Sequence, residues 1–112
     1  MGILATVGHY SPEGFIHILL DNESYASTGG QATVSSTVNF SKIADNAGYN
    51  NSVSVRKKEE LVSAVEKALI TKGPHFIHVK VLKGLDPELG RVELPPADIK
   101  ENFMDFLKEK NE

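Results

Sequence analysis

The sequence predicts an α/β fold, in which one parallel sheet is flanked by helices. Segments typical of strands and of helices alternate along the chain, an order that favours right-handed crossovers between parallel strands. The segment FIHILL at 15–20 is almost continuously apolar, which is typical of a strand buried on both faces of a sheet. A chain of 112 residues has room for one domain.

Three strands and four helices are expected in all. In the segment 75–82, Ile77 and Val79 share one face while His78 and Lys80 share the other, which indicates a strand. The segment 1–10 has helical spacing but no capping residue before it, so it resembles the later turns of a helix whose start is missing. The remaining strands are expected at 15–20 and 52–55, and the remaining helices at about 37–49, at 57–71 and from about 98, the last with Ile99, Phe103, Phe106 and Leu107 facing inward.

Composition and charge exclude several functional classes. The chain has 12 basic and 15 acidic residues, which gives a net charge of −3. It therefore lacks the excess of basic residues that is typical of nucleic-acid-binding proteins. It has no cysteine, so disulfides, thiolate metal sites and a cysteine nucleophile are excluded. No apolar run approaches the roughly 18 residues of a membrane span, and the N-terminus has no basic segment typical of a secretory signal. We therefore expect a cytoplasmic protein with neither a nucleic-acid nor a membrane partner.

The polar segment 21–36 is the best candidate for a functional site. It follows the first buried strand and is rich in Asn, Ser, Thr and Gly, and long loops inside compact domains are often functional. Ligands of open parallel sheets bind at the carboxyl ends of the strands, where Asn22 lies. An amide oxygen and free backbone carbonyls are hard donors that suit Mg²⁺ or Ca²⁺. An ordinary Asp-Asn turn at a strand end explains the same residues.

The segment LDNESYASTGGQATVS at 20–35 resembles the cofactor loop of thiamine-diphosphate decarboxylases, specifically the phosphonopyruvate and sulfopyruvate decarboxylase group. The segments GILATVG at 2–8 and YSP at 10–12 resemble the helix and turn before that loop. LGR at 89–91 and NFMDFL at 102–107 resemble the C-terminal end of the family. The resemblance covers nearly the whole chain and falls on the second half of the diphosphate-binding domain.

This resemblance implies a set of site residues. Asn22 and the backbone carbonyl of Ser24 correspond to two ligands of the Mg²⁺ that accompanies thiamine diphosphate in the family. The residues that the resemblance places at the cofactor are Asn22, Ser24, Tyr25, Thr28, Gly29 and Gly30. No residue is assigned as catalytic. The implied reaction is decarboxylation of a small 2-oxo acid that carries a phosphonate or sulfonate group.

The sequence departs from the family pattern at one decisive point. The family's third metal ligand is the aspartate of a Gly-Asp-Gly triplet, expected roughly 25 or more residues before the asparagine, and no such triplet occurs in residues 1–21. The pyrimidine-binding domain, which supplies the activating glutamate in the family, is absent too. We therefore expect residues 1–112 to form a partial cofactor-binding domain, inactive as an isolated chain. We also expect an oligomer that includes a chain or domain carrying the pyrimidine-binding half.

Three alternatives remain open on the sequence. The chain is a truncated remnant without catalytic activity, or a split subunit that is active only with a partner chain, or a small α/β module whose Asn- and Gly-containing loop binds another phosphate. These alternatives differ in whether the missing triplet is supplied elsewhere.

Overall fold

A computed structural model describes residues 2–84 and 93–110 of the chain. The main sheet contains three strands, and a separate two-stranded hairpin follows the first of them. The sheet strands are β1 (Ile16–Asp21), β4 (Asn51–Val55) and β5 (His75–Lys80), and the hairpin strands are β2 (Ser24–Tyr25) and β3 (Gln31–Ala32). The α-helices are α1 (Gly2–Tyr10), α2 (Phe40–Asn46), α3 (Lys58–Ile70) and α4 (Pro96–Glu109), and short 3₁₀ helices lie at Ala26–Thr28 and Val34–Ser36.

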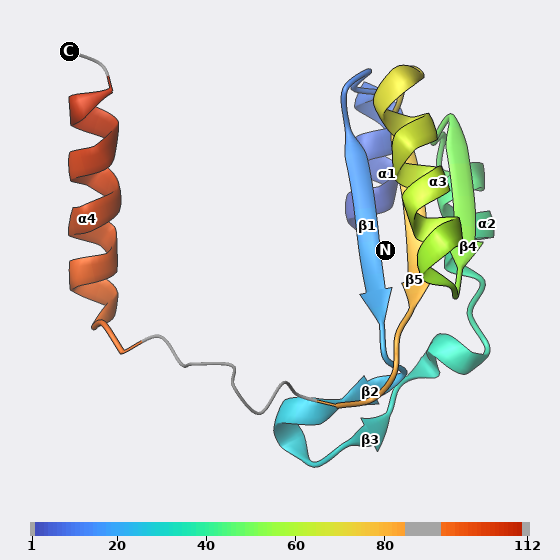
Figure 1. The fold of residues 1–112 in the computed structure, drawn as a ribbon, viewed down its shortest axis with the longest axis horizontal. Coiled ribbons are helices and arrows are strands. Elements are labelled where there is room, and N and C mark those ends of the chain that lie inside the picture. The colour runs from blue at the N-terminus through green and yellow to red at the C-terminus, as the bar shows by residue number, and fades with distance from the viewer. Residues whose placement is uncertain (1, 85–92, 111–112) are drawn as a thin grey trace.

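The three strands of the main sheet are parallel, in the order β1-β5-β4 (Figure 1). In the register of β1 and β5, Asp21 lies opposite Lys80. This arrangement confirms the predicted parallel α/β fold. Because all three strands run the same way, their carboxyl ends meet at one edge of the sheet, and the hairpin projects from that edge (Figure 1).

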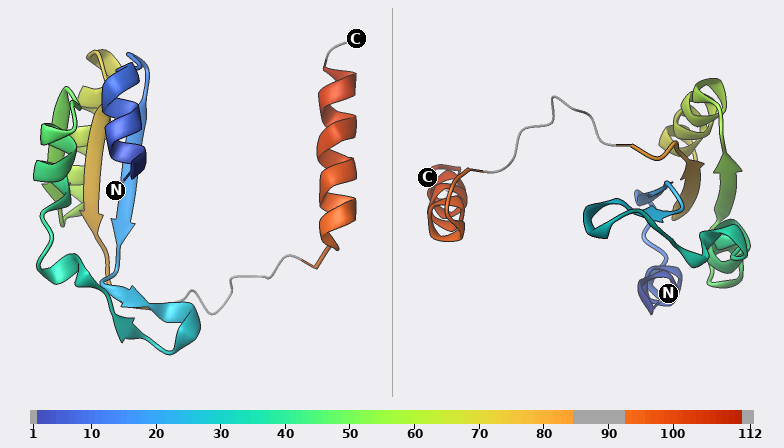
Figure 2. Two further views of the ribbon diagram at one scale, coloured as in Figure 1. Left: turned by 180° about the vertical axis from the view of Figure 1, so that it is seen from behind. Right: turned by 90° about the horizontal axis from the view of Figure 1, so that it is seen from below.

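Helices cover both faces of the sheet. Helices α1 and α2 lie on one face and α3 on the other (Figure 2). The first face contains the core cluster of Leu4, Val7, Ala44, Tyr49 and Phe76. The second face contains the cluster of Val55, Ile77 and Val79. The alternation in β5 is therefore as predicted, with Ile77 and Val79 facing α3 and Phe76 facing the opposite layer.

The two helices on the first face touch through their backbones. A Cβ atom added at Gly8 would lie 1.6 Å from the carbonyl oxygen of Ala47. Gly48, which has a φ of 102°, lies against Gly8 at the end of α2. Glycine at position 8 therefore sets how closely α1 approaches the end of α2 and so how tightly the first layer covers the sheet.

Helix α4 differs from its prediction. It begins at Pro96, two residues before the expected start, and stands apart from the sheet and its other helices (Figures 1 and 2). The prediction that its apolar residues face inward is wrong, because all of its residues are exposed. The exposed apolar side chains on it are Ile99, Phe103, Met104, Phe106 and Leu107. The amphipathic pattern correctly predicted a helix, but it does not indicate which surface the apolar face of that helix packs against.

Other element boundaries moved by a few residues. Helix α2 is shorter than the expected 37–49 at both ends. Asn39 caps its start by accepting a hydrogen bond from the backbone N–H of Lys42, and the helix ends at Asn46, before Gly48 with its φ of 102°. The segment 21–36, expected as a loop, contains the β2–β3 hairpin and two 3₁₀ helices. The LGR segment at 89–91 lies outside the described residues. Among the described helices, none has both the length and the apolar character that a membrane span requires.

Candidate functional site at the carboxyl edge of the sheet

Asn22 and Ser24 form a tight turn immediately after β1. The Asn22 Oδ1 atom accepts a hydrogen bond from the backbone N–H of Ser24 at 3.0 Å. Glu23 between them has a φ of 56°, the left-handed conformation that non-glycine residues rarely adopt. An amide oxygen has two lone pairs, so the hydrogen bond leaves Asn22 Oδ1 able to accept one further interaction. The turn therefore places both predicted metal ligands at the carboxyl end of β1.

The other predicted cofactor residues lie on the hairpin that follows. Tyr25 belongs to β2, Thr28 ends the first 3₁₀ helix, and Gly29 and Gly30 lead into β3. Both glycines have positive φ, 117° and 77°, which explains why glycine occupies these positions. The side chain of Gln31 closes the hairpin, because its Nε2 donates to the Thr28 carbonyl at 2.7 Å and its Oε1 accepts from the Thr28 hydroxyl at 3.0 Å.

A buried cluster of charged side chains lies beneath the turn. The Asp21 carboxylate, 7% exposed, accepts hydrogen bonds from the backbone N–H of Glu23 at 2.9 Å and from Lys80 Nζ at 2.7 Å. His78 Nε2 lies 2.9 Å from the second carboxylate oxygen of Asp21. Lys80 also contacts the Glu23 carboxylate and the Ser35 carbonyl. Three donors on β5 and in the turn thus converge on the last residue of β1.

The cluster shifts the acidity of its members in opposite directions. Burial works to raise the pKa of Asp21, but hydrogen bonds from Lys80, His78 and the Glu23 N–H outweigh burial and hold this pKa well below its usual range. Burial works to lower the pKa of Lys80, but the carboxylates of Asp21 and Glu23 raise it overall. At neutral pH the cluster therefore contains an ionised carboxylate paired with an ammonium group.

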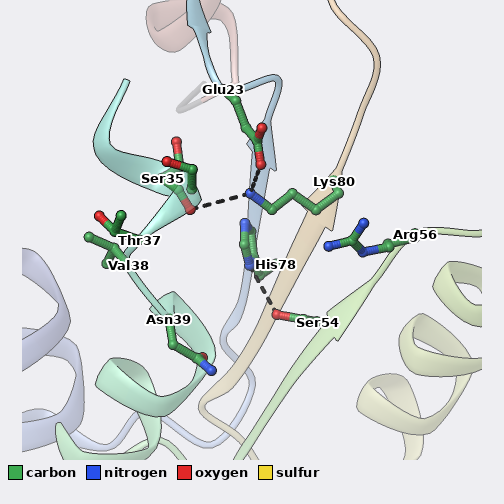
Figure 3. Close-up of a pocket in the computed structure, with 10 residues that line it drawn as sticks. Glu23, Ser35, Thr37, Val38, Asn39, Ser54, Arg56, His78 and Lys80 are labelled. Atoms are coloured by element: carbon green, nitrogen blue, oxygen red, sulfur yellow. Dashed lines mark hydrogen bonds and ion pairs between the residues drawn. The ribbon is translucent and has the colours of Figure 1, made fainter. Parts of the chain in front are cut away.

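A polar pocket of about 340 Å³ opens beside this cluster, at the carboxyl ends of β4 and β5 (Figure 3). Figure 3 shows the Lys80 ammonium group between Glu23 and Ser35, and Ser54 hydrogen-bonded to the His78 ring. The residues that line it are Glu23, Ser35, Ser36, Thr37, Val38, Asn39, Ser54, Arg56, His78 and Lys80. Asn22 and Ser24 are not among them, so the pocket lies beside the predicted metal turn.

The residues of this turn fit part of a Mg²⁺ site. Asn22 Oδ1 and the Ser24 carbonyl are hard, neutral oxygen donors of the kind that Mg²⁺ accepts. The carboxylate of Asp21, the residue before the turn, already has three hydrogen-bond donors. In the described part of the chain, no cluster of three or more His, Cys, Asp or Glu residues could hold a metal ion. Among the described residues, the turn therefore offers two neutral oxygen donors, and the carboxylates of Asp21 and Glu23 beside them are both paired with Lys80.

Sequence reasoning found the turn but missed the cluster below it. The sequence predicts a turn at Asp21 and a strand that carries His78 and Lys80 on one face, with no link between them. The signal was present, because two polar side chains on the same face of a buried parallel strand require polar partners. Finding Asp21 as that partner requires the β1–β5 register, which brings together residues 59 positions apart along the chain.

Comparison with known proteins is consistent with this geometry. Residues 1–79 match the family model described as the C-terminal thiamine-pyrophosphate-binding domain of thiamine pyrophosphate enzymes. The match includes the first two strands of the sheet, the Asn22–Ser24 turn and the β2–β3 hairpin. It also extends over β5 as far as Val79.

Several curated proteins are similar over nearly all of the chain. A phosphonopyruvate decarboxylase of Streptomyces viridochromogenes is 36% identical over 107 residues, which cover 96% of this chain and 27% of that protein. The beta subunit of sulfopyruvate decarboxylase from Methanococcus maripaludis is 33% identical over 108 residues, covering 96% of this chain and 57% of that subunit. The chain thus spans from about a quarter to just over half of the length of these relatives.

Proposed function

Since the chain belongs to the family of C-terminal cofactor-binding domains of thiamine pyrophosphate enzymes, we propose that it forms the diphosphate-binding part of a 2-oxo acid decarboxylase. The observation that carries the proposal is the Asn22–Ser24 turn at the end of β1, which lies within the matched residues. The names of the relatives favour phosphonopyruvate or sulfopyruvate as substrate. Both compounds are small 2-oxo acids with a second anionic group.

Each part of the site has a separate task in this proposal. Asn22 Oδ1 and the Ser24 carbonyl would hold Mg²⁺, and the hairpin residues Tyr25, Thr28, Gly29 and Gly30 would contact the cofactor. When bound, the thiazolium of thiamine diphosphate supplies the electron sink that decarboxylation requires. The residues of this chain hold and orient the diphosphate end.

We further propose that residues 1–112 are only part of the cofactor-binding domain and act with a chain or domain that carries the pyrimidine-binding half. The exposed outer strand of the sheet supports this. Strand β1 lies at the end of the order β1-β5-β4, yet its Ile18 and Leu20 are apolar and 46% and 66% exposed. An edge strand with exposed apolar side chains fits a sheet that continues onto another segment. Relatives named as beta subunits point to a multi-chain enzyme.

Titration calorimetry with thiamine diphosphate and Mg²⁺ tests the proposal. The chain alone is expected to bind weakly or not at all, because its two proposed metal ligands are neutral and the Glu23 carboxylate between them is paired with Lys80. An assembly that adds a Gly-Asp-Gly segment and a pyrimidine-binding domain from a relative is expected to bind the cofactor and to decarboxylate sulfopyruvate or phosphonopyruvate. Tight binding of the cofactor by the chain alone would contradict the partial-domain proposal.

Variants of the same assembly test the role of the turn. Asn22→Ala removes a metal ligand and is expected to weaken Mg²⁺-dependent cofactor binding by about tenfold or more, since even residues that only orient metal ligands cost about 10–100-fold. Asn46→Ala is the matched control, because Asn46 donates only to the Lys42 carbonyl within α2. If both variants bind like the unaltered protein, the turn is not the metal site. If inorganic phosphate binds but thiamine diphosphate does not, the chain is a phosphate-binding module instead.

A further inference from the structure

We propose that Asp21, His78 and Lys80 are positioning residues, which fix the Asn22–Ser24 turn in the conformation needed for metal binding. This inference rests on the proposed function, because it gives the turn a ligand. None of the three side chains is itself a proposed metal ligand. Their effect is on the two residues that are.

The first step of the argument is that Asp21 joins the sheet to the turn. One carboxylate oxygen accepts the backbone N–H of Glu23, the middle residue of the turn. The other oxygen faces His78 Nε2 and Lys80 Nζ, which both belong to β5. Because β5 is the central strand and pairs with both of its neighbours, its side chains are a rigid support.

The second step is that Lys80 holds the turn through the Glu23 side chain, whereas Asp21 holds it through the Glu23 backbone. Its ammonium group contacts Asp21, the Glu23 carboxylate and the Ser35 carbonyl, so each of its three N–H donors has an acceptor. Lys80 thereby ties the middle residue of the turn to the end of β1 and to the segment after the hairpin. It is 17% exposed, so little water competes for these contacts.

The third step is that the turn needs this support. Glu23 has a positive φ, which costs free energy for a residue with a side chain and persists only where the surroundings impose it. With Glu23 held there, Asn22 Oδ1 reaches the Ser24 N–H and both predicted ligands keep a fixed relative position. Metal sites depend on such outer contacts for the orientation of their ligands.

Amide hydrogen exchange, measured by NMR on the chain without cofactor, tests the inference. Asp21→Ala and Lys80→Met are expected to raise the exchange rates of the Glu23 and Ser24 amides at least tenfold, while the Ile77 and Val79 amides in β5 stay protected. A purely structural role would instead raise exchange throughout the sheet or leave the turn unchanged. Unchanged exchange at Glu23 and Ser24 in both variants would overturn the inference.

Two further variants guard against failure to fold. Glu23→Gln removes only the charge of the more exposed partner of Lys80. It is expected to raise the exchange rates of the Glu23 and Ser24 amides by a smaller factor than Lys80→Met, with the sheet intact. Lys72→Met is the matched control, because Lys72 pairs with Glu13 at an exposed site before the amino ends of β1 and β5, at the opposite end of the sheet from the turn. Loosening of the turn by Lys72→Met equal to that by Lys80→Met would also overturn the inference.

The assembly with a complete cofactor site separates this inference from the proposed function. Lys80→Met is expected to raise the Mg²⁺ concentration needed for half-maximal cofactor binding about tenfold or more, the range seen for residues that orient metal ligands. If the unaltered assembly binds no cofactor, the proposed function fails whatever the exchange data show. If it binds and Lys80→Met binds equally well despite a loosened turn, only the positioning role fails.

Discussion

The imidazole Nε2 atom of His78 lies 2.9 Å from the carboxylate of Asp21, although the two residues are 57 positions apart. The ring is held from its other side by Ser54, whose hydroxyl lies 3.0 Å from Nδ1. This chain of contacts crosses all three strands, from β4 through β5 to β1. The order of the three strands therefore determines the contacts of Asp21, the residue that precedes the Asn22–Ser24 turn.

Asp21 is expected to make the stability of the protein depend on pH in the acid range. Its pKa is lowered in the folded protein, so its contribution is complete above the unfolded value of about 4 and is lost as the pH falls below it. Urea unfolding between pH 2.5 and 7 should show a stability difference between the unaltered protein and Asp21→Asn that shrinks as the pH falls. A difference that is constant over this range would contradict the assignment.

Removing Lys80 should cost more than removing an exposed lysine. Lys80→Met leaves the buried Asp21 carboxylate without its cationic partner, which is expected to lower the free energy of unfolding by about 3 kcal/mol. Lys72→Met breaks an exposed pair with Glu13 and is expected to cost no more than about 1 kcal/mol. Urea unfolding at pH 7 measures both values. Equal losses would show that the cluster is not a buried ion pair.

A second pH-dependent pair lies on the α1–α2 side of the sheet. His17 Nδ1 is 3.0 Å from the hydroxyl of Tyr49, and burial lowers the pKa of His17 and raises that of Tyr49. NMR titration should give His17 a pKa below the usual value of about 6.5, and stability should decrease as the pH falls below that value. Tyr49→Phe is expected to cost about 1 kcal/mol at pH 7 through loss of the hydrogen bond.

The sequence predicted local elements far better than it predicted contacts between them. All three strands were found within two residues of their bounds, because the apolar runs and the alternation in β5 are local signals. The position of Asn22 at a strand end followed from the same signal. The partnership of Asp21 with Lys80 depends on strand order and register, which no local pattern encodes. The exposed stripe of α4, which includes Phe103, shows the same limit, since amphipathicity indicates a face but not its neighbour.

Substitution of two phenylalanines, one in the core and one on the exposed helix α4, is expected to have very different effects on stability. Phe76 is 1% exposed and packs between α1, α2 and the sheet, so Phe76→Ala is expected to lower the free energy of unfolding by about 3–5 kcal/mol. Phe103 on α4 is 60% exposed, so Phe103→Ala is expected to change it by less than about 0.5 kcal/mol. A large loss from Phe103→Ala would mean that α4 packs against another surface in solution.

Gly8 is expected to tolerate no side chain. An alanine Cβ there would overlap the backbone carbonyl of Ala47, a group that cannot rotate away, so α1 must shift off the end of α2. We expect Gly8→Ala to cost about 2–3 kcal/mol, the upper part of the range for overpacking. Gly2→Ala is the matched control, because nothing lies within 4 Å of a Cβ at that position and alanine favours the helix. Thermal unfolding should show a lower midpoint for Gly8→Ala and an equal or higher one for Gly2→Ala. An unchanged midpoint for Gly8→Ala would show that α1 and α2 are not in backbone contact.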